Sequence, residues 1–452
     1  MSLASASEAP DPPHDPYAPL RIPNFRWFVV SILTMAMGAQ IQGVVVAWQM
    51  YDVTRDPLAL GLVGLAEAAP FIGFALYAGH VADIRDRRRV ALVSLVLLCA
   101  CAGVLAVAST IFFAPGRARP GATIQLVIYG VIVVCGAARS FLLPARNALG
   151  ADLVPRPLFP SAVAWRAGAW QVAAVAGPAL GGVLYWLVGP TRSYAIAAAL
   201  MAASLVTVAR IRPPARPPSV RSAEPALIAS VREGLAFLFK RQIFVGAITL
   251  DLFAVLFGGA TAILPIFAAE VLHVGPTGLG GLRAAPAIGA VLMSGVIALR
   301  PPGRRLGRTF LRAVIAFGVF TIGFALSKSF VLSLVLLAAS GAADMLSVYF
   351  RATLMQVMVP SGMLGRVSAV NQIFIGSSNE LGAFESGVAA RLLGTVTSVV
   401  VGGAITIGVA VVTNWLFPPL AKLDSFADYA AAFDDGDGSA GPITRGPPSA
   451  PS

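Results

Sequence analysis

The chain has 452 residues, of which 57% are hydrophobic and only 12% are charged. Soluble domains carry about 25% charged residues, so this composition excludes an ordinary soluble protein and indicates a chain that resides in a lipid bilayer. The net charge of +12 would favour nucleic-acid binding in a soluble protein. Here the basic residues lie in short segments between apolar stretches, and we expect no nucleic-acid partner.

Apolar segments follow one another along the chain, and each is long enough to cross a bilayer core of about 30 Å as a helix. We predict twelve such spans, at 26–49, 60–82, 90–113, 122–145, 162–189, 193–210, 243–268, 278–299, 309–327, 330–358, 367–391 and 395–417. The pattern therefore predicts an all-α polytopic membrane protein with two six-helix bundles, at 26–210 and 243–417.

Polar stretches flank these bundles and separate them. Residues 1–25 are rich in Pro, Asp and Ser and lack the apolar core of a secretory signal, so we expect a disordered cytoplasmic tail. Residues 211–242 open with a Pro/Arg run and continue into an amphipathic stretch, which predicts a cytoplasmic linker with a helix on the membrane surface. Residues 418–452 are acidic and rich in Gly, Pro and Ser, and predict a second disordered cytoplasmic tail.

The distribution of Lys and Arg predicts the orientation in the membrane. When both termini are placed inside, most basic residues of the connecting segments also fall inside, in agreement with the positive-inside rule. An even number of spans agrees with termini on one side. We expect a multi-pass protein of the bacterial plasma (inner) membrane, with both termini in the cytoplasm.

The second half of the chain repeats small-residue motifs of the first half. Residues 136–139 (Gly-Ala-Ala-Arg) recur at an offset of 205 as residues 341–344 (Gly-Ala-Ala-Asp), and residues 68–70 (Ala-Ala-Pro) recur at an offset of 216 as residues 284–286. Small residues also recur by chance in membrane helices rich in Ala and Gly. Several matches in one register favour a parallel duplication, with the substrate site between the halves.

A charged loop follows the second span. Residues 79–89 read Gly-His-Val-Ala-Asp-Ile-Arg-Asp-Arg-Arg-Arg. Gly79 permits close helix approach, Asp83 can accept hydrogen bonds at the membrane edge, and Arg87 and Arg88 hold the loop on the cytoplasmic side. A plain positive-inside loop would explain the arginines but neither Gly79 nor Asp83.

This loop resembles the signature loop of the major facilitator superfamily. Gly79, Asp83, Arg87 and Arg88 match the family pattern, whereas Ile84 replaces the usual Arg and Asp86 the usual Gly. The resemblance implies a twelve-helix transporter in which this loop locks the cytoplasmic halves together when the protein opens outward. The equivalent loop of the second half, residues 300–308, keeps the positive charge but lacks the Asp.

The fifth span carries a second pattern of small residues, which includes Gly177, Pro178, Gly181 and Gly182. It resembles the antiporter signature of the same superfamily, with Ala173 in place of the first Gly. That signature is associated with exporters, although generic small-residue packing would give a similar pattern. Residues 251–265 and 360–382 resemble bacterial exporters of the enterobactin-exporter and macrolide-efflux kind. The resemblance implies export of a small molecule by a monomer.

Ionisable groups within membrane spans are costly, and each is by default a functional hypothesis. We take as candidates for proton binding or charge relay Asp344, Glu380, Asp251, Arg139, Arg351, Glu67 and Arg283. The repeat makes Arg139 equivalent to Asp344 and Glu67 equivalent to Arg283. One of these oppositely charged pairs could form a gate between the halves. Alternatively, each charge is neutralised within its own half.

Polar and aromatic residues within spans are candidates for the wall of a substrate cavity. They are Gln40, Trp48, Trp165, Arg166, Asn371 and Asn379. Most aromatic residues in membrane helices serve as packing or interface anchors, so the two tryptophans are weaker candidates. Acids and aromatics would suit cationic compounds, whereas Arg139 and Arg166 would suit anionic ones.

The sequence favours proton-coupled efflux of a small amphipathic molecule, such as a drug or siderophore, by alternating access. An importer of the same fold is disfavoured by the pattern in the fifth span, and a membrane sensor or scramblase stays open. An enzyme is not expected, because no span holds a central His and no hydrolase motif occurs. The three cysteines lack metal-binding spacing, and we expect no metal and no cofactor.

Overall fold

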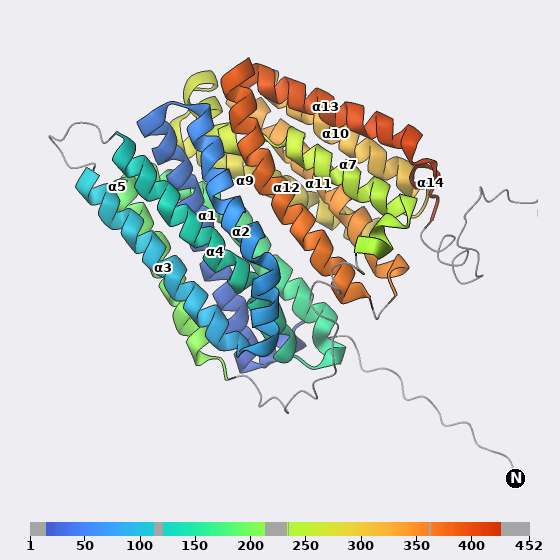
Figure 1. The fold of residues 1–452 in the computed structure, drawn as a ribbon, viewed down its shortest axis with the longest axis horizontal. Helices are drawn as coiled ribbons and strands as arrows, with labels where there is room; N and C mark the ends of the chain where they lie inside the picture. Colours follow the sequence, from blue (N-terminus) through green and yellow to red (C-terminus); the bar gives the residue numbers. More distant parts are fainter. Residues whose placement is uncertain (1–14, 113–120, 213–232, 234, 361–362, 426–452) are drawn as a thin grey trace, which may run out of the picture.

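The computed structural model describes residues 15–112, 121–212, 233, 235–360 and 363–425. These residues form helices and no β-strands (Figure 1). Most of each predicted tail and most of the predicted linker lie outside the described residues.

Long helices dominate the first half of the chain. They are α1 (Pro23–Thr54), α2 (Pro57–Ile84), α3 (Arg87–Phe112), α4 (Ala122–Asp152) and α5 (Phe159–Arg210), with the short helical turns η1 (Ala18–Arg21) and η2 (Arg156–Leu158). Inside α5, Gly189 has a φ of 74°, which only glycine adopts readily, and the helix bends there. This bend lies at the boundary that the sequence predicts between 162–189 and 193–210.

The second half of the chain, like the first, consists of long helices joined by short helical turns. Its helices are α7 (Gln242–Gly258), η3 (Thr261–Ile263), α8 (Leu264–Ile266), η4 (Phe267–Val271), α9 (Gly275–Leu299), α10 (Leu306–Leu326), α11 (Phe330–Met358), α12 (Leu364–Leu393), α13 (Thr395–Leu416) and α14 (Pro418–Ala421). Gly394, with a φ of 87°, joins α12 to α13.

Local sequence signals set several of these helix ends. Pro23 and Pro57 stand at the first positions of α1 and α2, where a helix needs no backbone N–H donor. Asp56 caps α2, because its carboxylate accepts a hydrogen bond from the Leu58 N–H at 3.0 Å. Asp86 caps α3 in the same way, accepting from the N–H groups of Arg88 and Arg89.

Ten helical segments in the described part of the chain are long and apolar enough to cross a membrane. One of them, Arg156–Arg210, contains the Gly189 bend, and another, Gln242–Val271, joins α7 to the short turns that follow it. Helix α12 is 30 residues long but lies outside this set, and it carries the polar Asn371, Asn379 and Glu380. For the described residues, the prediction of an all-helical fold is confirmed.

Glycines bring helices together within each half of the chain. Gly136 of α4 lies against the backbone of Glu67 and the ring of Pro70 in α2, and Gly341 of α11 lies against the backbone of Pro286 in α9. A Cβ atom at either glycine would overlap these neighbours. The small-residue motifs therefore work as helix contacts, as expected where lipid supplies no hydrophobic driving force.

The two halves also contact each other through glycines. Gly61 of α2 packs on Gly387 of α12, and Gly182 of α5 packs on Gly280 of α9. In Figure 1 the blue-to-green helices and the yellow-to-red helices approach each other at the upper end of the view and diverge below. The space between the two groups holds the cavity described next.

Candidate functional site

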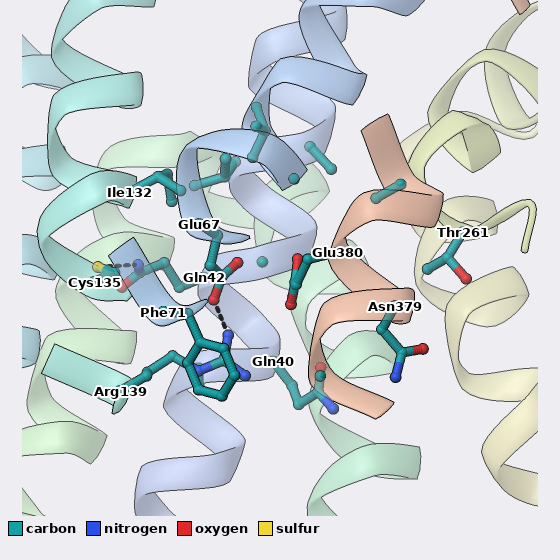
Figure 2. Close-up of a pocket in the computed structure, with 18 of the residues that line it drawn as sticks. Gln40, Gln42, Glu67, Phe71, Ile132, Cys135, Arg139, Thr261, Asn379 and Glu380 are labelled. Atoms are coloured by element: carbon teal, nitrogen blue, oxygen red, sulfur yellow. Dashed lines mark hydrogen bonds and ion pairs between the residues drawn. The ribbon is translucent and has the colours of Figure 1, made fainter. Parts of the chain in front are cut away.

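A cavity of about 680 Å³ lies between the two halves. Residues of α1, α2, α4 and α5 form one side, and residues of α7, η3, α9 and α12 form the other (Figure 2). Much of its wall is apolar and includes Val46, Val63, Phe71, Ile132 and Ile375. A site of this size and character suits a drug-sized molecule with an apolar body.

An ion pair from the first half lies in the cavity wall. Arg139 of α4 donates a hydrogen bond to the carboxylate of Glu67 in α2, and both side chains are only partly exposed (Figure 2). The contact of Gly136 with Glu67 and Pro70 holds the two helices close enough for this pair. Of the two arrangements that the sequence leaves open, this pair shows neutralisation within one half.

Glu380 of α12 faces this ion pair from the second half (Figure 2). Its carboxylate interacts electrostatically with Arg139. Arg139 therefore lies within the influence of two carboxylates, one from each half of the chain. A cation shared in this way couples the protonation of one carboxylate to the charge of the other.

Two further arginines line the cavity. Arg283 of α9 reaches toward α1, and its Nη1 would lie 3.5 Å from a Cβ atom at Gly43. Arg146 of α4 donates to the Sδ atom of Met35 at 3.7 Å. The Nε atoms of both arginines are buried, with no hydrogen-bond partner among the described residues.

A second charged cluster lies within the other half, outside the cavity wall. Arg351 of α11 donates to the Asp251 carboxylate of α7 at 2.6 Å, with both side chains less than 10% exposed. Asp344, on the same helix as Arg351, interacts electrostatically with both members of the pair. In this group one arginine, Arg351, interacts with two carboxylates, those of Asp251 and Asp344.

Two of the residues predicted to line a cavity do so. Gln40 and Asn379 both lie in its wall (Figure 2). Trp48 is placed elsewhere, with its ring against those of Tyr51 and Tyr185. Trp48 therefore packs against other aromatic rings, as expected for most aromatic residues in membrane helices.

The remaining predicted cavity residues also lie away from this wall. The Trp165 indole donates to the carbonyl of Pro16 at 2.9 Å. Arg166 donates to the Asn147 side chain at 2.7 Å. Asn371 is partly buried in α12, nearer its N-terminal end than the cavity residues.

The signature loop after α2 holds its own half together in this structure. Arg87 forms an ion pair with Asp152 at 2.7 Å, at the end of α4, and Arg88 donates to the carbonyls of Val208 and Ala209 at the end of α5. Among the described residues outside its own turn of helix, no atom lies within 4 Å of the position of a Cβ at Gly79. The side chain of Asp83 lies outside the described residues.

The small residues of the fifth predicted span make contacts both within and between halves. Gly177 packs on Gln40 and Gly181 on Ile41, so that α5 lies close along α1. The carbonyl of Pro178, like Gly182, lies against Gly280 of α9 in the other half. The stretch therefore shapes the cavity wall through Gln40 and also joins the two halves.

Polar contacts that the sequence analysis did not single out join the halves beyond the cavity. The hydroxyl of Tyr51 in α1 donates to the Glu270 carboxylate of η4 at 2.7 Å. Arg391 of α12 pairs with Asp56, the cap of α2, at 2.9 Å. These residues lie at or near helix ends, where charged and polar residues are common. Their types and spacing therefore did not indicate a contact between distant segments.

Comparisons with known proteins place this arrangement in a family. The family model for transmembrane secretion effectors, MFS_3, matches residues 14–434. Macrolide efflux protein A of Streptococcus pyogenes is 22% identical over 412 residues, which cover 87% of this chain and 95% of that protein. Multidrug efflux pump Tap of Mycolicibacterium fortuitum is 24% identical over 381 residues, which cover 80% and 88% of the two chains.

Solved structures share the fold at low sequence identity. A POT family transporter in complex with 5-aminolevulinic acid matches with a TM-score of 0.68 and 12% identity, over 88% of this chain and 96% of the other. The nucleoside transporter NupG matches with a TM-score of 0.59 and 14% identity, over 87% and 99%. These two likenesses concern the fold alone.

Proposed function

This chain belongs to the transmembrane secretion effector family of the major facilitator superfamily, and from that premise we propose that it exports a small amphipathic molecule in exchange for protons. The family is one of transporters and not a class of enzymes. The relatives named as macrolide and multidrug efflux proteins favour export.

One observation carries the proposal. The cavity lies between the two halves, and each half supplies ionisable groups to it: the Glu67–Arg139 pair from one side and Glu380 from the other. A site at the interface of two halves is open to one side of the membrane at a time if the halves rock against each other. The charged groups there interact with the substrate, and the carboxylates among them can bind the exchanged proton.

The proposed architecture has twelve transmembrane helices in two six-helix halves, at 26–210 and 243–417, related by a parallel repeat. Equivalent contacts support the repeat, because Gly136 packs on α2 at Pro70 and its counterpart Gly341 packs on α9 at Pro286. The offset of 205 residues relates Gly136 to Gly341, and the offset of 216 residues relates Pro70 to Pro286. The division of α5 at Gly189 and the length of α12 support a count of twelve.

The conformation supports a cavity that faces the cytoplasm. The halves join at the end that carries Asp56, Glu270 and Arg391, opposite the arginine-rich loop at Arg87. The positive-inside rule places that loop in the cytoplasm, with both termini beside it in the plasma membrane. Outside the helical turn of Gly79, the described residues leave the space within 4 Å of a Cβ at Gly79 empty, and we propose that a helix of the other half moves against Gly79 when the cytoplasmic ends close.

Proton coupling is assigned to the charges of the cavity. Glu67 and Glu380 both interact electrostatically with Arg139. Protonation of one carboxylate therefore strengthens the attraction between Arg139 and the other carboxylate. Movement of this cation between carboxylates of different halves would link proton binding to rocking. Asp344, Asp251 and Arg351 form the alternative proton site.

The proposal is tested by gradient-driven transport in everted membrane vesicles, with a panel of cationic and neutral dyes and a catecholate siderophore. We expect accumulation that a protonophore abolishes, because the proton gradient drives it. Glu380→Gln removes the titratable carboxylate and should lower gradient-driven flux at least about tenfold, while equilibrium exchange of substrate persists.

Asp52→Asn is the control, since Asp52 is a carboxylate near the end of α1, paired with Arg55 and outside the cavity wall. It should leave flux within about twofold of wild type. Wild-type flux that is unchanged by the protonophore would refute proton coupling. Loss of coupling in Asp344→Asn or Asp251→Asn, but not in Glu380→Gln, would move the proton site to the second cluster. Accumulation in right-side-out vesicles instead would indicate an importer.

A further inference from the structure

The cavity contains more positive than negative side chains. Arg139, Arg146 and Arg283 line it, against the two carboxylates Glu67 and Glu380. Both carboxylates act on Arg139, Glu67 through the ion pair and Glu380 through its electrostatic interaction. Arg146 and Arg283 are therefore the two arginines of the wall that have no carboxylate partner among the described residues, in a wall with one more arginine than carboxylates.

The repeat shows what Arg146 lacks. At the offset of 205 residues its counterpart is Arg351, which is bonded to Asp251 at 2.6 Å. At the offset of 216 residues the counterpart of Asp251 is Met35, and Arg146 does contact Met35, at 3.7 Å. The two halves thus build the same contact, but a thioether stands where the second half has a carboxylate.

The charged groups that act on Arg146 do not compensate for this loss. They are Arg139 and Arg166, both positive. A guanidinium stays protonated in proteins, so Arg146 cannot relieve the repulsion by losing its proton. Arg146 therefore keeps its charge beside two other positive groups, with the Met35 thioether as the hydrogen-bond acceptor that the structure gives it.

Arg283 is unbalanced in a similar way from the other half. Its counterpart in the repeat is Glu67, whose partner Arg139 corresponds to Asp344. A symmetrical structure would pair Arg283 with Asp344, but the described residues contain no such ion pair, and Asp344 interacts with Arg351 instead. Arg283 extends into the cavity beside Gly43, with its Nε buried and unpartnered.

An unpaired guanidinium in a site of low polarity costs free energy that an anion from outside would recover. We infer that the substrate is an amphipathic anion, and that Arg146 and Arg283 bind its negative group while apolar residues such as Phe71 and Ile132 surround its body. The anionic group is a carboxylate, sulfonate or phosphate, each of which accepts paired hydrogen bonds from an arginine.

This inference rests on the proposed export function and narrows its substrate class. It also assigns one binding residue to each half, so that a bound anion connects the halves across the cavity. The names of the macrolide and multidrug efflux relatives do not enter this assignment, which rests on the arginines of this chain.

The test uses two fluorescent probes of similar size and opposite charge, the carboxylate dansylphenylalanine and the amine dansylcadaverine. Binding to the purified full-length protein and accumulation in everted vesicles are measured for both. We expect Arg283→Gln and Arg146→Gln each to raise the half-saturating concentration of the carboxylate by about tenfold to a hundredfold. Binding of the amine should not weaken, because the substitutions remove only positive charge.

Arg192→Gln is the matched control, because Arg192 is an exposed arginine outside the cavity wall. It should leave both probes within about twofold of wild type. Arg283→Lys and Arg146→Lys keep the charge, and they show whether the loss of binding in the Gln variants comes from misfolding. They should bind the carboxylate more tightly than the Gln variants but less tightly than wild type, since lysine lacks the paired donors.

Failure of the inference can be separated from failure of the proposed function. Preference of the wild type for the amine, with no effect of the Gln variants on the carboxylate, would overturn the anionic substrate and leave export intact. Carboxylate binding that weakens in the Gln variants, without gradient-driven flux of any probe, would support the binding site and refute the export function. No binding of the carboxylate to the wild type would overturn the inference.

Discussion

At the scale of single residues, the buried charges of the second half carry a prediction for stability. Arg351 is bonded to Asp251 and also acts on Asp344. Arg351→Met therefore strands two carboxylates, and should cost about 3–5 kcal/mol, the usual cost of breaking a buried pair. Asp251→Asn leaves Arg351 with Asp344 and should cost less. Thermal unfolding in detergent measures both losses.

The order of the two effects is the discriminating result. Equal losses for Arg351→Met and Asp251→Asn would show that Asp344 does not compensate for Asp251. Arg300→Gln serves as the control, because Arg300 is exposed at the end of α9. It should change the free energy of unfolding by no more than about 0.5 kcal/mol.

At the scale of helices, glycines decide how closely α9 and α11 approach. Gly341 lies against the backbone of Pro286, so Gly341→Ala must push the helices apart. We expect a loss of about 1–3 kcal/mol, the usual cost of overpacking. Gly295→Ala in α9 is the control, since nothing lies within 4 Å of its Cβ position. It should be neutral or stabilise by up to about 1 kcal/mol. Thermal unfolding that affects both variants equally would contradict this packing role.

At the scale of the whole molecule, the contacts beyond the cavity predict that the halves must separate there during transport. Asp56 and Arg391 come from different halves, and the Nη1 atom of Arg391 lies 2.9 Å from the Oδ2 atom of Asp56. The span of the two side chains is too long for a direct disulfide, so the test joins Asp56→Cys/Arg391→Cys with a bis-methanethiosulfonate cross-linker, which reduction cleaves. The cross-link should hold these ends together and abolish flux, and reduction should restore it. The single-cysteine variants treated with the same reagent are the controls. Full flux with the cross-link formed, as judged by electrophoretic mobility, would show that this end does not open.

How far the sequence predicts the molecule also differs between these scales. The helical character of the segments and the boundary after residue 189 follow local patterns, and the structure agrees with them. The repeated glycines Gly136 and Gly341 were visible in the sequence, but their contacts were not. For the site, Gln40 and Asn379 lie in the cavity wall as predicted, whereas Trp48 and Trp165 pack elsewhere. The type of an aromatic residue does not reveal which face of its helix meets the cavity.

The sequence by itself determined that this is an all-helical membrane protein of the transporter family that its motifs resemble. It did so because apolar length and small-residue spacing are properties of contiguous segments. Only the tertiary structure decided which charges neutralise each other, since Arg139 and Glu67 are 72 residues apart and Arg351 and Asp251 are 100 apart. The rotation and crossing of the helices determine those partners, and within the part of the chain that the structure describes they leave Arg146 and Arg283 in the cavity wall without a carboxylate partner.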